Sequence, residues 1–139
     1  MIDYIAEIRI NYRTINNKIS SATDVYKKVK EFSNKTQEHF ITIYLDGANR
    51  VLETRVNFIG TLNQSLVHPR EIFNSAIKLS CASIITVHNH PSGILEPSEE
   101  DINITKRIKE ASKILGIELL DHLIISEFGF YSFKDGSFL

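Results

Sequence analysis

Hydrophobic residues follow two different periods along this chain, and the two periods predict strands and helices in turn. Residues that alternate in polarity, or that are apolar and β-branched, predict strands over 4–12, 40–45, 51–59, 82–87, 117–126 and 128–133. Apolar residues recur at helical spacing over 20–35, 69–79 and 98–115, which predicts helices there. Strands that alternate with helices predict an α/β domain, with helices packed against a β-sheet.

Turn and cap residues separate these elements. The stretch Asp46-Gly47-Ala48-Asn49 has good turn chemistry, so the strands on either side of it are expected to form an antiparallel hairpin. Pro69 suits the first turn of a helix, and Gly116 suits the residue that ends one. Residues 82–87 are apolar nearly throughout, as in a central strand covered on both faces. The hairpin makes a sheet of mixed strand direction the expected arrangement.

Composition narrows the class of protein. The 139 residues are expected to form a single domain, 1–139, and 42% hydrophobic and 24% charged residues are ordinary for a globular protein. The net charge of −1 gives no electrostatic case for nucleic acid, which a basic surface would favour. The basic residues of the last predicted helix are expected to form a solvated face; they are Lys106, Arg107, Lys109 and Lys113.

Cysteine content and hydropathy suggest a compartment. Cys81 is the single cysteine, so an internal disulfide is excluded, and the residue is expected to be a small buried hydrophobe. No apolar run approaches the ~18 residues of a membrane span. The first residues alternate in polarity and lack the apolar block of a signal peptide. A cytoplasmic location without membrane contact is the expectation.

The stretch "VHNHPSGILEPSEED", residues 87–101, contains the candidate chemistry. His88 and His90 are two residues apart at the end of a buried strand, so their side chains can share one face. Ligands usually bind at such strand ends in α/β folds, and imidazole nitrogen is a good zinc ligand. Pro91, Gly93 and Pro97 predict a turn that folds the chain back toward the strand end.

Asp101 can be the third ligand, and it also has a simpler explanation. Three protein ligands with an open fourth position are typical of catalytic zinc. Yet Ser98-x-x-Asp101 resembles a capping box, and acidic residues in a first helical turn need no metal. The paired histidines favour the metal, and the two roles are compatible. Ser98 can begin the helix while its hydroxyl faces the water that the metal binds.

A hydrolase also needs a general base beside the metal. Spacing alone leaves Glu38, Glu53, Glu71 and other carboxylates open, although Glu38 directly precedes a predicted strand. In "LLDHLII", either Asp121 or His122 is expected to support a zinc-binding histidine, or else to be a satisfied core residue.

The motif His-x-His, seven residues, Ser, two residues, Asp resembles the JAMM motif of JAB/MPN metalloproteases. "HNHPSG", "LLDHLII", "GTLNQSLVHPREIF" and "QEHFITIYLD" are similar to RadC-family proteins over most of residues 23–133. The resemblance implies a JAB/MPN fold, similar to that of cytidine deaminases. It also implies Zn²⁺ held by His88, His90 and Asp101, Ser98 near the water, and Glu38 as the general acid/base.

The expected function is therefore that of a zinc-dependent metallopeptidase acting on peptide or isopeptide bonds. One alternative is a metal-containing module that binds a partner without turnover; another is a DNA-repair-associated accessory protein. RadC proteins commonly carry an N-terminal helical region, which is not expected in this chain, so DNA is suggested by family association alone. A peptide or protein substrate is the expected partner, and the sequence does not indicate an oligomeric state.

Overall fold

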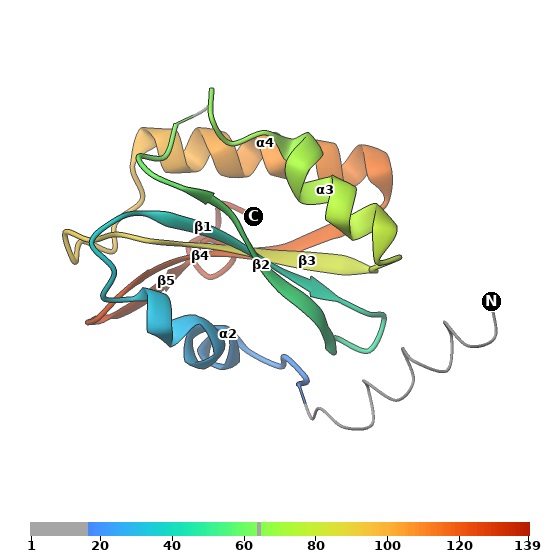
Figure 1. Ribbon diagram of the computed structural model, residues 1–139, viewed down its shortest axis with the longest axis horizontal. Helices are drawn as coiled ribbons and strands as arrows, with labels where there is room; N and C mark the ends of the chain where they lie inside the picture. Colours follow the sequence, from blue (N-terminus) through green and yellow to red (C-terminus); the bar gives the residue numbers. More distant parts are fainter. Residues whose placement is uncertain (1–16, 64) are drawn as a thin grey trace.

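The computed structural model describes residues 17–63 and 65–139, whose strands form one five-stranded sheet (Figure 1). The strand order is β2-β1-β3-β4-β5. β1 is antiparallel to β2 and β3, β3 is parallel to β4, and β4 is antiparallel to β5. The predicted α/β class and mixed strand direction are thus confirmed. The strands are β1 (His39–Leu45), β2 (Val51–Ile59), β3 (Ser83–Asn89), β4 (Glu118–Ser126) and β5 (Gly129–Ser132).

Helices cover both faces of this sheet. α3 (Pro69–Lys78) and α4 (Glu99–Leu115) lie on one face, and α2 (Ala22–Val29) lies on the other, followed by the short 3₁₀ turn η1 (Lys30–Phe32) (Figure 1). All three predicted helices are present, and α3 and α4 match their expected ends within one residue. The first was predicted to run to residue 35, but its α-helical part ends at Val29 and η1 extends it only to Phe32. The strand predicted over residues 4–12 lies outside the described residues.

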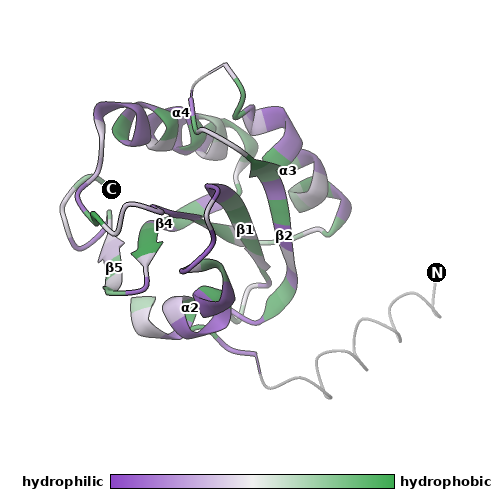
Figure 2. Ribbon diagram, turned by 60° about the vertical axis from the view of Figure 1, so that its left-hand side comes forward, coloured by the Kyte–Doolittle hydropathy of each residue, from purple (hydrophilic) through white to green (hydrophobic). Residues whose placement is uncertain are grey.

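Strand alternation divides the core into two layers, and Figure 2 shows the apolar strands between the more polar helix surfaces. Phe40 and Tyr44 of β1 face α3 and α4, whereas Ile41 and Ile43 face α2. The layer under α3 and α4 includes Ile72, Phe73, Ile104 and Ile108, and the layer over α2 includes Val25, Val29, Val87 and Leu123. Because β3 is buried on both faces along its whole length, its reading as a central strand is confirmed.

The two central strands separate at the end of the sheet. β1 and β3 pair from Leu45 and Ser83 as far as Phe40 and His88. Beyond that point β3 stays with β4, since the His90 N–H donates to the Ile125 carbonyl. The other strand stays with β2 instead, through a bond from Gly60 to the carbonyl of Glu38. The divergence opens a cleft of about 560 Å³. Residues 36–38 and 60–62 line one side of it, and the residues that line the opposite side include His90, Ser98 and Asp101.

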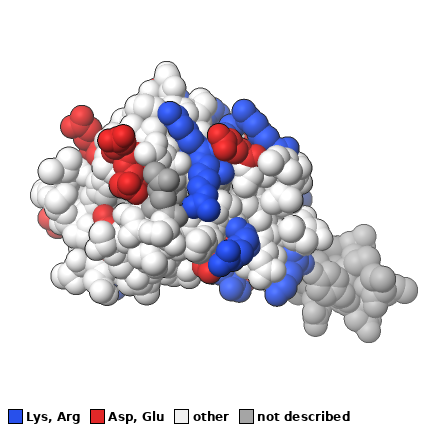
Figure 3. Space-filling view, turned by 90° about the horizontal axis from the view of Figure 1, so that it is seen from above, with Lys and Arg blue, Asp and Glu red and all other residues white. Residues whose placement is uncertain are grey.

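Helix hydropathy and the placement of charged side chains bear on the predictions about membranes and about the basic helix face. Within residues 17–63 and 65–139, no helix is both long enough and apolar enough to cross a membrane. Lys106, Arg107 and Lys113 of α4 are exposed, as expected of a solvated face, and Lys109 is partly exposed. Figure 3 shows that, on the side of α3 and α4, the Lys and Arg side chains are interspersed with acidic ones.

Candidate metal centre

His88 and His90 project from the end of β3 toward one spot. Their Nε2 atoms are 2.9 Å apart. His88 belongs to the strand and is fully buried, while His90 follows it directly and is about one-tenth exposed. The predicted shared face is therefore observed, although the regular strand ends one residue before His90.

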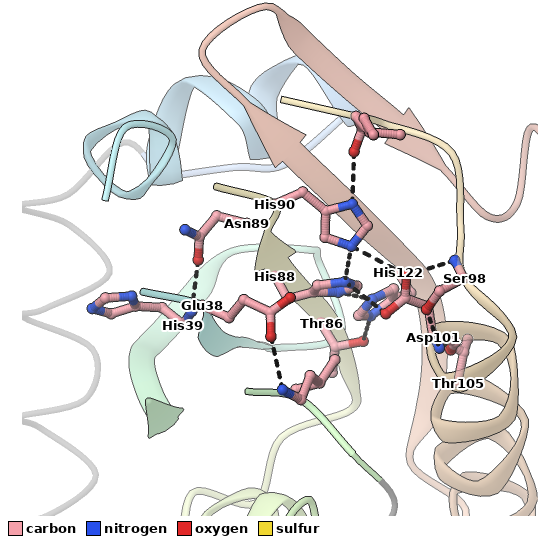
Figure 4. Close-up of polar contacts among 12 residues, drawn as sticks. Glu38, His39, Thr86, His88, Asn89, His90, Ser98, Asp101, Thr105 and His122 are labelled. Carbon is pink, nitrogen blue, oxygen red and sulfur yellow. Dashed lines mark hydrogen bonds and ion pairs between the residues drawn. The ribbon is translucent and has the colours of Figure 1, made fainter. Parts of the chain in front are cut away.

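Asp101 reaches the same spot from the first turn of α4. Its Oδ1 is 3.0 Å from Nε2 of His88, and its Oδ2 is 3.1 Å from Nε2 of His90 (Figure 4). The same carboxylate completes a capping box: Oδ2 accepts from the Ser98 N–H at 2.8 Å, and Ser98 Oγ accepts from the Asp101 N–H at 3.1 Å. The two explanations of Asp101 therefore hold together. Oδ2 accepts the hydrogen bond of the helix cap, and Oδ1 remains available to a metal ion.

Outer hydrogen bonds set the tautomer of His90 and allow the metal-binding tautomer of His88. Nδ1 of His90 lies 2.6 Å from the carbonyl oxygen of Ile94, which can only accept, so Nδ1 carries the proton. The Nε2 atom of neutral His90 then presents a lone pair to the centre. Metal-binding histidines are usually fixed in this way by a carbonyl or carboxylate at the outer nitrogen.

His122 performs the equivalent task for His88. Nδ1 of His88 is 2.7 Å from Nε2 of His122, and Nδ1 of His122 is 2.6 Å from Oγ1 of Thr86. Burial, and secondarily the charge of His88, hold the pKa of His122 well below its usual range, so this ring is neutral. If Nδ1 of His88 donates to Nε2 of His122, the single ring proton of neutral His122 is on Nδ1, beside Thr86 Oγ1. Nε2 of His88 then faces the centre without a proton. Of Asp121 and His122, His122 is therefore the residue that hydrogen-bonds to a histidine of the candidate centre.

Asp121 has a separate structural task. Its carboxylate accepts hydrogen bonds from the backbone N–H groups of His122 and Lys134, and the Ser132 hydroxyl donates to it at 2.5 Å. Burial raises the pKa of this carboxyl despite those bonds. Asp121 therefore ties β4 to the segment after β5, on the sheet face away from the centre.

Electrostatics at the centre favour a cation. Burial alone would raise the pKa of Asp101, but its hydrogen bonds with His88 and His90 outweigh burial and hold that pKa well below the usual range. Burial lowers the pKa of His90, but the bonds to Asp101 and to the Ile94 carbonyl outweigh it and raise the pKa. An ionised carboxylate and two inward-facing nitrogens thus converge, and lone pairs this close require a proton or a metal ion among them.

The donor set fits a zinc-type ion. The ligand atoms of His88, His90 and Asp101 all lie within 4.8 Å of one another. With bonds of 2.0–2.1 Å, tetrahedral ligand atoms lie about 3.3 Å apart. The observed separations of 2.9–3.1 Å would have to widen by only a few tenths of an ångström. Two imidazoles and one carboxylate are also the ligand types that such ions take, and they leave a position open.

Glu38 lies across the cleft from this cluster. It directly precedes β1, and Figure 4 shows its side chain extending toward the histidines. Its Oε2 accepts from the Leu62 N–H at 2.7 Å, which leaves Oε1 for another partner. Glu53 instead pairs with Arg55 on β2, and Glu71 lies in the first turn of α3. Of Glu38, Glu53 and Glu71, Glu38 is the one that lines the cleft.

Ser98 and Cys81 can also be placed. Ser98 is exposed, lines the cleft and uses its oxygen for the cap, so its hydroxyl proton is left for another acceptor. Cys81 is buried in the α3–α4 layer, where burial raises the pKa of its thiol to about 11. It is the small buried hydrophobe that the sequence predicts.

The substitution Ser98→Ala is expected to lower the free energy of unfolding by about 1 kcal/mol, because it removes an N-cap acceptor. Ser21→Ala is the matched control, since Ser21 caps α2 by accepting from the Asp24 N–H at 3.2 Å. Urea unfolding should show comparable losses for the two variants. A negligible loss for Ser98→Ala alone would show that the cap is not needed to hold α4.

Fold and site together define a JAB-type domain: a mixed sheet between helices, with a His-His-Asp cluster at the ends of its central strands. The sequence profile of the RadC-like JAB domain matches residues 19–138, and the chain belongs to that family. The resemblance seen in the sequence is thereby confirmed.

Curated relatives agree with this assignment. The chain is 57% identical over 104 residues to a UPF0758 protein of Geobacillus sp. (strain WCH70), covering 75% of this chain and 46% of the relative. It is 50% identical over 121 residues to one of Shouchella clausii, covering 86% and 53%. It is 54% identical over 104 residues to UPF0758 protein YsxA of Bacillus subtilis, covering 75% and 45%. The chain thus spans about half the length of these relatives.

Proposed function

We propose that this domain is a zinc-dependent hydrolase of peptide or isopeptide bonds. The observation that carries the proposal is the convergence of His88, His90 and Asp101, with a carboxylate facing them across an open cleft. JAB domains include metalloproteases, which supports a peptide-type carbonyl as the substrate group. The cleft volume of about 560 Å³ is in the range of small-ligand and peptide sites.

Each residue has a definable task. A bound zinc ion would supply Lewis acidity for the substrate carbonyl and would lower the pKa of water toward ~7. Glu38, held at Oε2 by Leu62, would take the proton of the attacking water at Oε1 and pass it to the leaving amine. The Ser98 hydroxyl would donate a hydrogen bond to the developing oxyanion and keep its proton.

Metal uptake and hydrolysis together test the proposal. The purified chain should take up stoichiometric Zn²⁺ by elemental analysis after dialysis. It should also cleave a fluorescence-quenched peptide library, lose that cleavage with a chelator and regain it with Zn²⁺. No metal uptake at all would sink the proposal. Uptake without any cleavage would favour a metal-containing binding module instead.

A further inference from the structure

Asn89 stands between the two histidines of the centre, yet its side chain points away from them to the segment that carries Glu38. Nδ2 donates to the Gln37 carbonyl at 2.9 Å. Oδ1 accepts from the His39 N–H at 2.6 Å, as Figure 4 shows. The side chain is fully buried. One amide therefore holds the backbone on both sides of Glu38.

This amide takes the place of regular strand pairing. The last paired residues of β1 and β3 are Phe40 and His88, and continuing that register would set Glu38 opposite His90. Regularly paired strands lie about 4.8 Å apart, which would leave no room for a substrate between Glu38 and the histidines. With the Asn89 side chain inserted, the Gln37 carbonyl and the His39 N–H bond to its amide, so the backbone beside Glu38 is held without regular strand pairing.

We propose that Asn89 is a positioning residue that sets the distance between Glu38 and the metal centre. The inference rests on the proposed function, in which Glu38 moves the proton. The metal ligands have supports of their own, because His122 holds His88 and the Ile94 carbonyl holds His90. Loss of the Asn89 amide should therefore displace Glu38 and leave the ligand set in place.

Two variants test the role of Asn89. Asn89→Ala removes both hydrogen bonds; Asn89→Asp keeps the acceptor for His39 and sets an oxygen against the Gln37 carbonyl. Both should lower kcat for the quenched peptides at least about tenfold, since displacements near 1 Å have large effects on rate. Zn²⁺ affinity, measured by competition with a chromophoric chelator, should change less than about threefold.

A second readout does not need catalysis. The Leu62 amide donates to Glu38, so hydrogen exchange followed by NMR reports whether that carboxylate stays in place. Exchange at Leu62 should become at least about tenfold faster in both variants. Exchange at Ala82, whose amide bonds to Leu45 at the far end of β1, should stay unchanged.

Asn57→Ala is the matched control. The Asn57 amide also makes two side-chain hydrogen bonds within the sheet, with Thr42 and Tyr44, and neither touches residues 37–39. This variant should leave exchange at Leu62 and kcat unchanged. Unchanged exchange at Leu62 in the Asn89 variants would overturn the inference. If the wild type cleaves nothing, the proposed function fails by itself, and the exchange experiment still decides the role of Asn89.

Discussion

Glu38→Gln is expected to lower turnover by about 10²- to 10⁴-fold, the usual range for loss of a general acid/base. Glutamine has the same length and can still accept from the Leu62 N–H through its carbonyl oxygen, so the side chain should keep its position. What it loses is the ability to take up a proton at the other terminal atom. The metal ligands are unchanged, and Zn²⁺ content should remain that of the wild type.

The measurement is kcat and KM on the quenched peptides, with zinc content determined on the same samples. Glu53→Gln is a suitable control, because Glu53 lies on the adjacent strand β2 and pairs with Arg55 outside the cleft. It should retain wild-type turnover. Wild-type turnover in Glu38→Gln would remove Glu38 from the proposed mechanism, and loss of zinc would instead make it a ligand.

The sequence was sufficient for the fold because local patterns and tertiary packing agree here. The hairpin of β1 and β2, the doubly covered strand β3 and the amphipathic α4 all follow from periodicity and turn chemistry. What periodicity did not show is the separation of β1 from β3 beyond Phe40 and His88, since strand pairing depends on residues about fifty positions apart. That separation creates the cleft.

The candidate site was predictable only in part. His88 and His90 could be paired from strand geometry, but the choice of Glu38 among several carboxylates depended on the family resemblance. Sequence reasoning missed the role of Asn89, whose partners lie 50 and 52 positions upstream. The hydrogen bond between His88 and His122 likewise spans 34 positions, so the sequence could offer His122 only as an alternative to Asp121.

Ser-x-x-Asp occurs twice at helix starts in this chain, which shows how little that pattern decides by itself. Ser21 and Asp24 begin α2, and Ser98 and Asp101 begin α4. Both serines accept from the aspartate N–H, and both aspartates accept from a serine N–H through Oδ2. Only at α4 do two imidazoles meet the carboxylate, so the histidines, and not the cap, mark the candidate metal ligand.

Because Asp24 and Asp101 both lie at helix starts, Asp24→Asn is the control for Asp101→Asn. Asp101→Asn is expected to weaken Zn²⁺ binding by more than about 100-fold, since changes to groups behind the ligands already cost 10–100-fold. The new carbonyl oxygen can keep the bond from the Ser98 N–H. The new NH₂ group would then point at Nε2 of His88 and donate to the lone pair that the metal needs. The metal-free variant should therefore fold normally.

Thermal unfolding with and without Zn²⁺ at pH 8 distinguishes a metal-binding role of Asp101 from a purely helix-capping one. In the wild type, zinc at 100 times Kd should add about 2.7 kcal/mol of stability, and Asp101→Asn should lose that increment. Without metal, Asp24→Asn should lose about 0.3–1 kcal/mol, because it removes one negative charge from a helix N-terminus. Asp101→Asn should lose at least as much, because the carboxylate that it removes also bonds to His88 and His90. Asp24→Asn should keep the full response to zinc. An equal zinc response in both variants would mean that Asp101 is a helix cap and not a ligand, since both carboxylates accept a backbone N–H at a helix start but only Asp101 meets His88 and His90.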